Sequence, residues 1–157
     1  MTPISPKPEI LAPAGSKAAF IAALAAGADA VYCGLKQFSA RMAAENFSPS
    51  ELASLVTRAH EQGAVVYVAV NSLVRPGELD RVRGLIRLLS RHIRPDALII
   101  QDLALVELAR QEEFAGELHL STLSAVTFAA ALQTAAGQVR LPEIRDTPPF
   151  LHGGAEV

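Results

Sequence analysis

The sequence predicts an α/β protein, a partial TIM-like (β/α) barrel with parallel strands and about five βα units. Short apolar runs alternate along the chain with helical patterns, which is typical of parallel βα architecture. Polar side chains follow each apolar run, as they do where a site is built on the carboxyl ends of parallel strands. The run Ala64–Val70 is apolar on both faces, which suits a parallel sheet covered on its outside. Because a full barrel needs about 200–250 residues, a chain of 157 residues predicts a partial one.

Recognisable signals delimit the elements of the first half. Ser16 stands where an N-cap belongs, and Gly27 ends a helix rich in small residues. Ser48-Pro49-Ser50-Glu51 combines a cap, a proline at the first helical position and a glutamate three residues after the cap. The predicted elements are strand Glu9–Ala12, helix Lys17–Ala26, strand Ala30–Gly34, a helix that begins at Pro49 and ends at Gly63, and strand Ala64–Val70.

The second half continues the alternation. Pro76 opens a helix whose apolar positions, spaced by three and four residues, are Leu79, Val82, Ile86, Leu89 and Ile93. The further elements are strand Ala97–Ile100, helix Leu103–Glu113, strand Glu117–Leu120 and an alanine-rich helix Val126–Ala136. Prolines and glycines interrupt the pattern after Gly137. We therefore expect one partial barrel domain over 1–157, with regular βα units in 9–136 and an irregular tail in 137–157.

Composition limits the class of protein. Hydrophobic residues make up 50% of the chain and charged residues 19%, which favours a folded domain. The net charge of −2, without long charged runs, gives no basic footprint, so no DNA partner is expected. The single cysteine, Cys33, excludes a disulfide framework and a cysteine-only metal or iron–sulfur site. With no leader pattern and no apolar run of about 18 residues, we expect a soluble cytoplasmic protein without a membrane partner.

Residues just past the strand ends, most of them polar, are the candidate substrate-binding residues. In chain order they are Gly15, Arg41, Asn46, Asn71, Gln101, Asp102, Ser121 and Thr122. The planar fork of an arginine suits a carboxylate or a phosphate, although Arg41 could equally be a solvated loop residue. The amides of Asn71 and Gln101 would orient a ligand without transferring protons. For Asp102 the alternative role is a helix N-cap.

His119 is a further candidate, because residues alternate in direction along a strand. His119 and Ser121 share one face of their strand, and Leu118 and Leu120 share the other. A His119 that faces inward could carry a proton, whereas the alternative is a satisfied core histidine. The catalytic residues are unknown, since neither a Gly-x-Ser-x-Gly elbow nor a His-Glu-x-x-His helix occurs. Cys33, inside an apolar strand, is expected to be a buried and inert thiol.

Several motifs resemble, in order and spacing, the N-terminal barrel half of the collagenase-like peptidase family (peptidase U-thirty-two). The matching pieces are Glu9–Gly15, Gly27–Gly34, Phe38–Arg41 with Asn46 and Phe47, Val68–Asn71, Asp96–Asp102 and His119–Thr122. Two positions depart from the family, because Leu123 and Phe128 stand where it usually has glutamine and asparagine. The segment Phe150–Gly153 is similar to a family strand that ends in His-Gly, which adds His152 to the substrate-binding candidates.

The resemblance implies a TIM-type barrel and two different chemistries. Members of the family carry peptidase names, yet better understood relatives resemble oxygen-independent hydroxylation factors for ribosomal RNA, transfer RNA or a quinone precursor. Those relatives hold an iron–sulfur cluster on four cysteines. Hydroxylation is the better motivated chemistry here, because no proteolytic apparatus can be assembled from these residues. The implied partners of full-length relatives are an anionic or aromatic small substrate, or RNA.

The same resemblance sets expectations for this chain by itself. The sequence looks truncated ahead of the family's cluster cysteines, so we expect no cofactor in this chain and no activity from it alone. Open sheet edges would allow self-association. The alternative function is a catalytically inactive barrel fragment that persists as a remnant or as a partner of another chain. A small phosphate-binding barrel is a weaker reading, because no glycine-rich phosphate loop follows the later strands.

Overall fold

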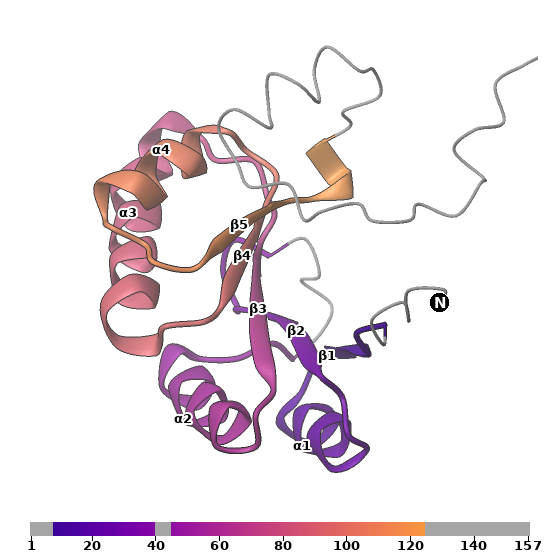
Figure 1. Cartoon of the computed structure of the whole chain (residues 1–157). Helices are drawn as coiled ribbons and strands as arrows, with labels where there is room; N and C mark the ends of the chain where they lie inside the picture. The colour runs from indigo at the N-terminus through magenta and orange to yellow at the C-terminus, as the bar shows by residue number, and fades with distance from the viewer. Residues whose placement is uncertain (1–7, 40–44, 125–157) are drawn as a thin grey trace, which may run out of the picture.

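Parallel strands form one sheet in the computed structural model, which describes residues 8–39 and 45–124 (Figure 1). The strands are β1 (Leu11–Ala14), β2 (Ala30–Gly34), β3 (Val65–Val70), β4 (Ala97–Ile100) and β5 (Glu117–Leu120). They lie side by side in chain order, and every neighbouring pair is parallel. This order is that of the first part of a (β/α) barrel, so the predicted fold class is confirmed.

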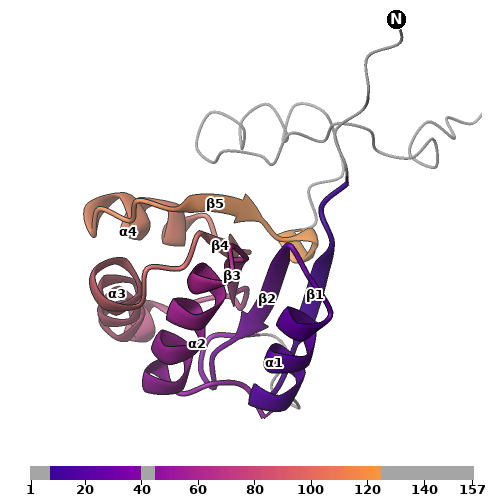
Figure 2. The ribbon, with the colours of Figure 1, turned by 60° about the horizontal axis from the view of Figure 1, so that its bottom comes forward.

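Helices connect the strands and cover one face of the sheet (Figures 1 and 2). They are α1 (Lys17–Ala25), α2 (Pro49–Glu61), α3 (Leu79–Leu88) and α4 (Ala104–Gln111). Shorter turns are the 3-10 helices η1 (Pro76–Glu78) and η3 (Thr122–Ser124) and the π-helical turn η2 (Leu89–Ile93). Among the described residues, no helix is both long and apolar enough to cross a membrane.

The predicted starts of α1 and α2 are confirmed by their hydrogen bonds, whereas Pro76 opens η1 and α3 begins at Leu79. Ser16 Oγ accepts from the backbone N–H of Ala19 at 3.3 Å and begins α1. At α2, Ser48 Oγ accepts from the N–H of Glu51, and a Glu51 carboxylate oxygen accepts from the N–H of Ser48 at 2.9 Å. The Ser48 hydroxyl also donates to this carboxylate, and this bond, followed by the one from the Ser48 N–H, holds the pKa of Glu51 below its usual range. Gly27, with φ of +81°, follows α1 in a conformation that favours glycine.

The boundaries of several elements differ from prediction. β1 is shifted two residues toward the C-terminus and includes Pro13, which the predicted strand Glu9–Ala12 left out. An edge strand tolerates proline because part of its N–H groups have no strand partner. α4 is Ala104–Gln111, shorter than the predicted Leu103–Glu113, and α1 and β3 each lose one terminal residue. The predicted helix Val126–Ala136 and the tail 137–157 lie outside the described residues.

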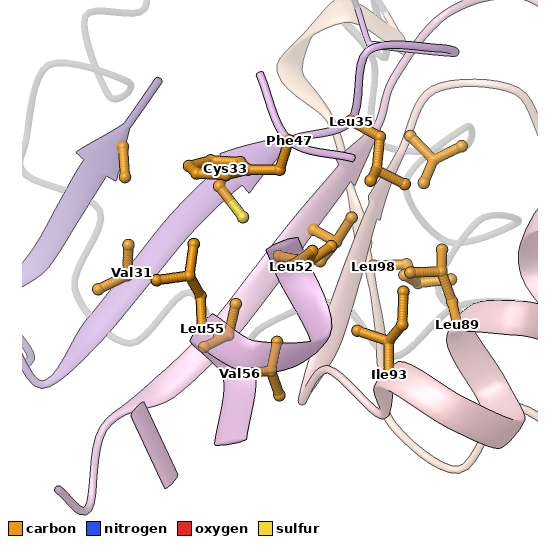
Figure 3. Packing of buried hydrophobic residues seen from close by; sticks show 14 of the residues in the cluster. Val31, Cys33, Leu35, Phe47, Leu52, Leu55, Val56, Leu89, Ile93 and Leu98 are labelled. Carbon is orange, nitrogen blue, oxygen red and sulfur yellow. The ribbon is translucent and has the colours of Figure 1, made fainter. Parts of the chain in front are cut away.

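Alternate residues of each strand face the helices and form the core (Figure 3). The strand residues in this core are Ala14, Val31, Cys33, Val66, Val68, Val70, Leu98 and Ile100. They pack against buried helix residues such as Leu52, Leu55 and Leu89. Cys33 is buried as predicted, and its burial raises the pKa of the thiol to about 12. The remaining strand residues face the other side of the sheet, where no described helix lies.

Two aspartates fix the register at the amino ends of the strands. Asp29 Oδ2 accepts from the N–H of Ile10 at 2.9 Å, and Asp96 Oδ2 accepts from the N–H of Val66 at 2.7 Å. Each aspartate immediately precedes a strand; Asp29 accepts from the residue just before β1, and Asp96 accepts from a residue of β3. These carboxylates hold β1 to β2 and β3 to β4 at the amino ends of the strands.

Candidate functional site

A cavity of about 870 Å³ lies on the face of the sheet that the helices leave uncovered. The residues that line it come from all five strands and from the loops that follow them. Tyr32 and Tyr67 are register partners on β2 and β3, and Tyr67 lies level with Glu117 through Ala97. The sheet therefore supplies a row of large side chains near the amino ends of the strands.

The next row toward the carboxyl ends is smaller and leaves a hollow. Gly34 pairs with Ala69, Ala69 pairs with Ile99, and Ile99 pairs with His119. Gly34 and Ala69 contribute almost no side-chain volume, so space remains above them, bounded by Ile99 and His119. All four residues line the cavity.

The loop after β2 closes over Gly34. A Cβ atom on Gly34 would lie 2.4 Å from Ser39 Oγ and 3.1 Å from Asn46 Oδ1, so only glycine lets these side chains come so close. Ser39 and Asn46 are 3% and 7% exposed. The N–H of Asn46 donates to the carbonyl of Gly15 at 3.0 Å, which ties the loop to the end of β1. The predicted residues Gly15 and Asn46 thus meet at one end of the cavity.

The ends of β3 and β5 bring further predicted residues to the same cavity. Asn71, Ser121 and Thr122 all line it. Ser121 is buried, its N–H donates to the carbonyl of Ile100 at 2.7 Å, and its Oγ accepts from the N–H of Leu123 at 3.2 Å. Its hydroxyl therefore orders the turn that follows β5.

Gln101 and Asp102 brace the rim instead of lining the cavity. Asp102 Oδ2 accepts from the N–H of Val74 at 3.1 Å, and its Oδ1 accepts from the N–H of Ala104 at 3.0 Å. Gln101 Nε2 donates to the carbonyl of Leu123 at 3.1 Å. The loop after β4 is thereby joined to the loop after β3 and to the turn after β5. Asp102 therefore accepts from the first residue of α4, although the N-cap position predicted for it is occupied by Leu103. Two other candidates, Arg41 and His152, lie outside the described residues.

His119 faces inward and lines the cavity, with its side chain 13% exposed. Its Nε2 lies 3.0 Å from Glu117 Oε2. Its ring meets that of Tyr67 edge to face, with centroids 5.0 Å apart and an interplanar angle of 69°. This contact crosses β4, and the small side chain of Ala97 leaves room for it.

Sequence reasoning missed Glu9, Tyr67 and Glu117, which complete this end of the cavity. The Tyr67 hydroxyl donates to the Glu9 carboxylate at 3.2 Å and 3.3 Å to its two oxygens. Burial, and then the negative charge of Glu9, raise the pKa of Tyr67 to about 12, so its phenol stays neutral. The signal was available in the strand alternation, because Tyr67 has the opposite parity to the core residues Val66 and Val68.

The described residues do not fit an iron–sulfur cluster. Within residues 8–39 and 45–124, no group of three or more His, Cys, Asp or Glu side chains could hold a metal ion. The chain's single cysteine, Cys33, points into the helix-covered core. We therefore derive no chemical step through a cluster in this part of the chain.

Comparison with known proteins identifies the family. Residues 15–139 match the model of Peptidase family U32, which is most of the chain. The chain belongs to this family. Among its U32 relatives is an uncharacterised protease of Methanocaldococcus jannaschii, 35% identical over 103 residues. A tRNA hydroxylation protein of Bacillus subtilis is 32% identical over 130 residues, and the 23S rRNA 5-hydroxycytidine synthase of Escherichia coli is 40% identical over 122 residues.

These alignments cover 66%, 83% and 78% of the chain but only 25%, 31% and 18% of the three relatives. The chain thus spans less than a third of the length of each of these three curated relatives. A solved U32 peptidase shares the fold, with a TM-score of 0.66 over 87% of this chain and 57% of that one. At 14% identity, this likeness concerns the fold alone.

Proposed function

We propose that this chain is the substrate-binding barrel half of a U32 protein that hydroxylates RNA, and that its cavity receives a nucleobase. The observation that carries the proposal is the cavity on the uncovered face of the sheet, which extends to the carboxyl ends of the parallel strands, where barrel enzymes bind substrates. Its lining combines aromatic rings with amide and hydroxyl groups. Proteins that act on single bases recognise them by stacking and by hydrogen bonds to the base edge. The tRNA- and rRNA-hydroxylating relatives support the same substrate class.

The charges of the lining favour a neutral ring over an anion near the amino ends of the strands. Among the described lining residues, Glu9 and Glu117 are acidic and none is a lysine or arginine. A phosphate there would be repelled by two carboxylates. We propose that the phosphate of a nucleotide binds instead to Arg41, whose planar fork suits it. The base would then enter first.

Proteolysis is a second candidate because some relatives carry protease and collagenase names. The described residues give it less support. No hydrogen bond joins a serine, threonine or cysteine among them to His119, and the Ser121 hydroxyl accepts from Leu123 N–H. A hydrolase nucleophile needs a base within hydrogen-bond reach.

Titration of the ¹⁵N-labelled chain with cytidine, uridine and a gelatin peptide tests the proposal. We expect both nucleosides to shift the amide signals of Gly34, Asn71 and Ser121, and the peptide to shift none of them. Asn71→Ala should weaken nucleoside binding by about 2- to 10-fold, the loss of one hydrogen bond. Gln62→Ala, at the C-terminal end of α2 away from the cavity, should leave it unchanged. Gelatin cleavage by the chain, with no nucleoside response, would favour the protease instead.

A further inference from the structure

We propose that His119 is the proton-transferring residue of the cavity, with Glu117 and Tyr67 as its positioning residues. The inference rests on the proposed function in one respect only, the nature of the bound ring. Nothing else about the pair of His119 and Glu117 depends on RNA. Its support is the geometry around a single imidazole.

The first element is the hydrogen bond at 3.0 Å between His119 Nε2 and Glu117 Oε2. An ionised carboxylate only accepts, so Nε2 carries the hydrogen, and Nδ1 is left with its lone pair. No residue in the described ranges hydrogen-bonds to Nδ1.

The second element is the restraint on the ring plane. Tyr67 meets the imidazole edge to face, and the Tyr67 ring is itself held by the hydrogen bond from its hydroxyl to Glu9. The charged or titratable groups facing His119 are therefore Glu117 on its own strand, and Tyr67, Tyr32 and Glu9 across the cavity. A base held in one orientation needs little reorganisation when it reacts.

The third element is the hollow beside the ring. Ile99, Ala69 and Gly34 continue the row of His119 across the sheet, and the last two leave space for a planar ligand. In the proposed step, Nδ1 accepts a proton from an N–H or O–H of the ligand. The bonding electron pair stays on the ligand atom, and the positive charge on the imidazolium lies against Glu117. The reverse step returns the proton.

His60 provides a matched internal control. Its Nε2 lies 2.9 Å from Asp96 Oδ2, so it also pairs with a carboxylate. Its side chain is 41% exposed, against 13% for His119, and it does not line the cavity. If carboxylate pairing and exposure alone set reactivity, His60 should react faster than His119 with any electrophile.

Alkylation of the full chain by two probes tests the proposal: phenacyl bromide, which is a bromomethyl ketone, and bromoacetamide, which is an amide. Phenacyl bromide carries an aromatic ring, and bromoacetamide does not. In both, the imidazole lone pair forms a C–N bond, the C–Br bond breaks, and bromide leaves with the electron pair. We expect phenacyl bromide to raise the ratio of His119 to His60 labelling by about 5-fold over bromoacetamide, through ring contacts in the cavity. The His119 adduct should be on Nδ1.

Two variants separate positioning from folding. Glu117→Ala should give a mixture of Nδ1 and Nε2 adducts at His119, since neither nitrogen is then held protonated, while His60 labelling stays constant. Tyr67→Leu should reduce the preference for the aromatic probe and leave the labelled nitrogen unchanged. Labelling of His119 on Nε2, or an equal probe ratio at His119 and His60, would overturn the proposal. Protection of His119 by cytidine would support the proposed function, and failure of cytidine to protect a selectively labelled His119 would reject that function while the proton-transfer role stands.

Discussion

At the scale of single residues, the absence of a side chain at Gly34 decides where a whole loop lies. Ser39 and Asn46 occupy the space that a Cβ atom would take, and their positions complete one wall of the cavity. Cys33, the residue before it, points to the opposite face and fills the core. Two neighbouring residues of β2 therefore have different roles: Gly34 shapes the cavity, and Cys33 packs in the core.

Gly34→Ala should destabilise the chain and damage the site together. The added methyl group would meet Ser39 Oγ at 2.4 Å, and relieving such overpacking typically costs about 1–3 kcal/mol. Urea unfolding measures the loss, and nucleoside titration should show weaker binding. Gly84→Ala, in α3, is the control, because no neighbouring atom lies within 4 Å of the Cβ atom that it adds. This substitution should raise the free energy of unfolding by about 0.5–1 kcal/mol, since alanine favours a helix over glycine. Equal effects of the two substitutions would contradict this account of the loop.

The Cys33 thiol should make stability fall at high pH. Its pKa is about 12 in the folded chain and about 8.5 for a free thiol, so unfolding releases a proton between these values. The stability present below about pH 8.5 should therefore be lost as pH rises toward 12, by about 1.4 kcal/mol per pH unit. Urea unfolding at several pH values measures this slope. Cys33→Ala should remove this dependence of stability on pH below about pH 10. Above about pH 10 the variant should still lose stability, because the pKa of Tyr67 is also higher in the folded chain than in the unfolded chain.

At the scale of elements, α3 and α4 are held together by a buried carboxylate. Glu112 follows α4 and accepts two hydrogen bonds from the Arg87 guanidinium, at 2.8 Å and 3.0 Å. Ser90 Oγ donates to the backbone carbonyl of Glu112 at 2.9 Å. The hydrogen bonds from Arg87 hold the pKa of Glu112 below its usual range. The end of α4, and with it the start of β5, is thereby fixed against α3.

Glu112→Gln should lower the thermal midpoint at pH 7. The neutral amide of glutamine has one oxygen acceptor and no negative charge, so it cannot replace both hydrogen bonds that the carboxylate accepts from the Arg87 guanidinium. The pKa of Glu112 is depressed, so its contribution is present above the usual glutamate range near pH 4 and is lost as the pH falls below it. Thermal melts of variant and parent should therefore converge in acid. Glu113→Gln, at the exposed next residue, is the control and should melt like the parent. A constant gap down to pH 2 would show that the charge is not responsible.

At the scale of the whole molecule, the described sheet is open. β1 and β5 each pair with a single described strand, and Ile10 and Leu11, beside and within β1, are 53% and 45% exposed. A complete (β/α) barrel closes by pairing its first and last strands. Open edges with apolar side chains favour pairing between chains.

We expect the purified chain to self-associate in a concentration-dependent way. Sedimentation velocity measures this, and Leu11→Lys should shift the distribution toward the monomer, because a charge on an edge strand opposes pairing. Leu73→Lys is the control, since Leu73 is the most exposed of the large apolar side chains described but lies in the loop after β3. A monomeric parent chain at all concentrations would rule out edge pairing.

We also expect the chain to be purified without an iron–sulfur cluster. A single cysteine with a buried thiol cannot supply the four thiolates of such a cluster. Elemental analysis and the visible absorption spectrum measure this directly. Stoichiometric iron with acid-labile sulfide would mean that other residues of the chain bind the metal.

The sequence by itself determined the elements and the end of the sheet that carries the site. Apolar runs, caps and glycines are local signals, so β2, β4 and β5 were predicted to the residue, and polar residues after the strands were predicted to converge. Gly15, Asn46, Asn71 and Ser121 do line one cavity. The β1 boundary was wrong because whether Pro13 is tolerated depends on its strand being at an edge.

Only the tertiary structure decided which polar groups act together. The alternation of side chains along a strand determines which residues share a face of the sheet. The register between neighbouring strands determines which of those residues are in contact. That register places Tyr67 beside His119 across Ala97, and it joins Gln101 and Asp102 to neighbouring loops instead of to the cavity. Such contacts depend on residues far apart in the chain, and their strength depends on burial. A local pattern contains neither.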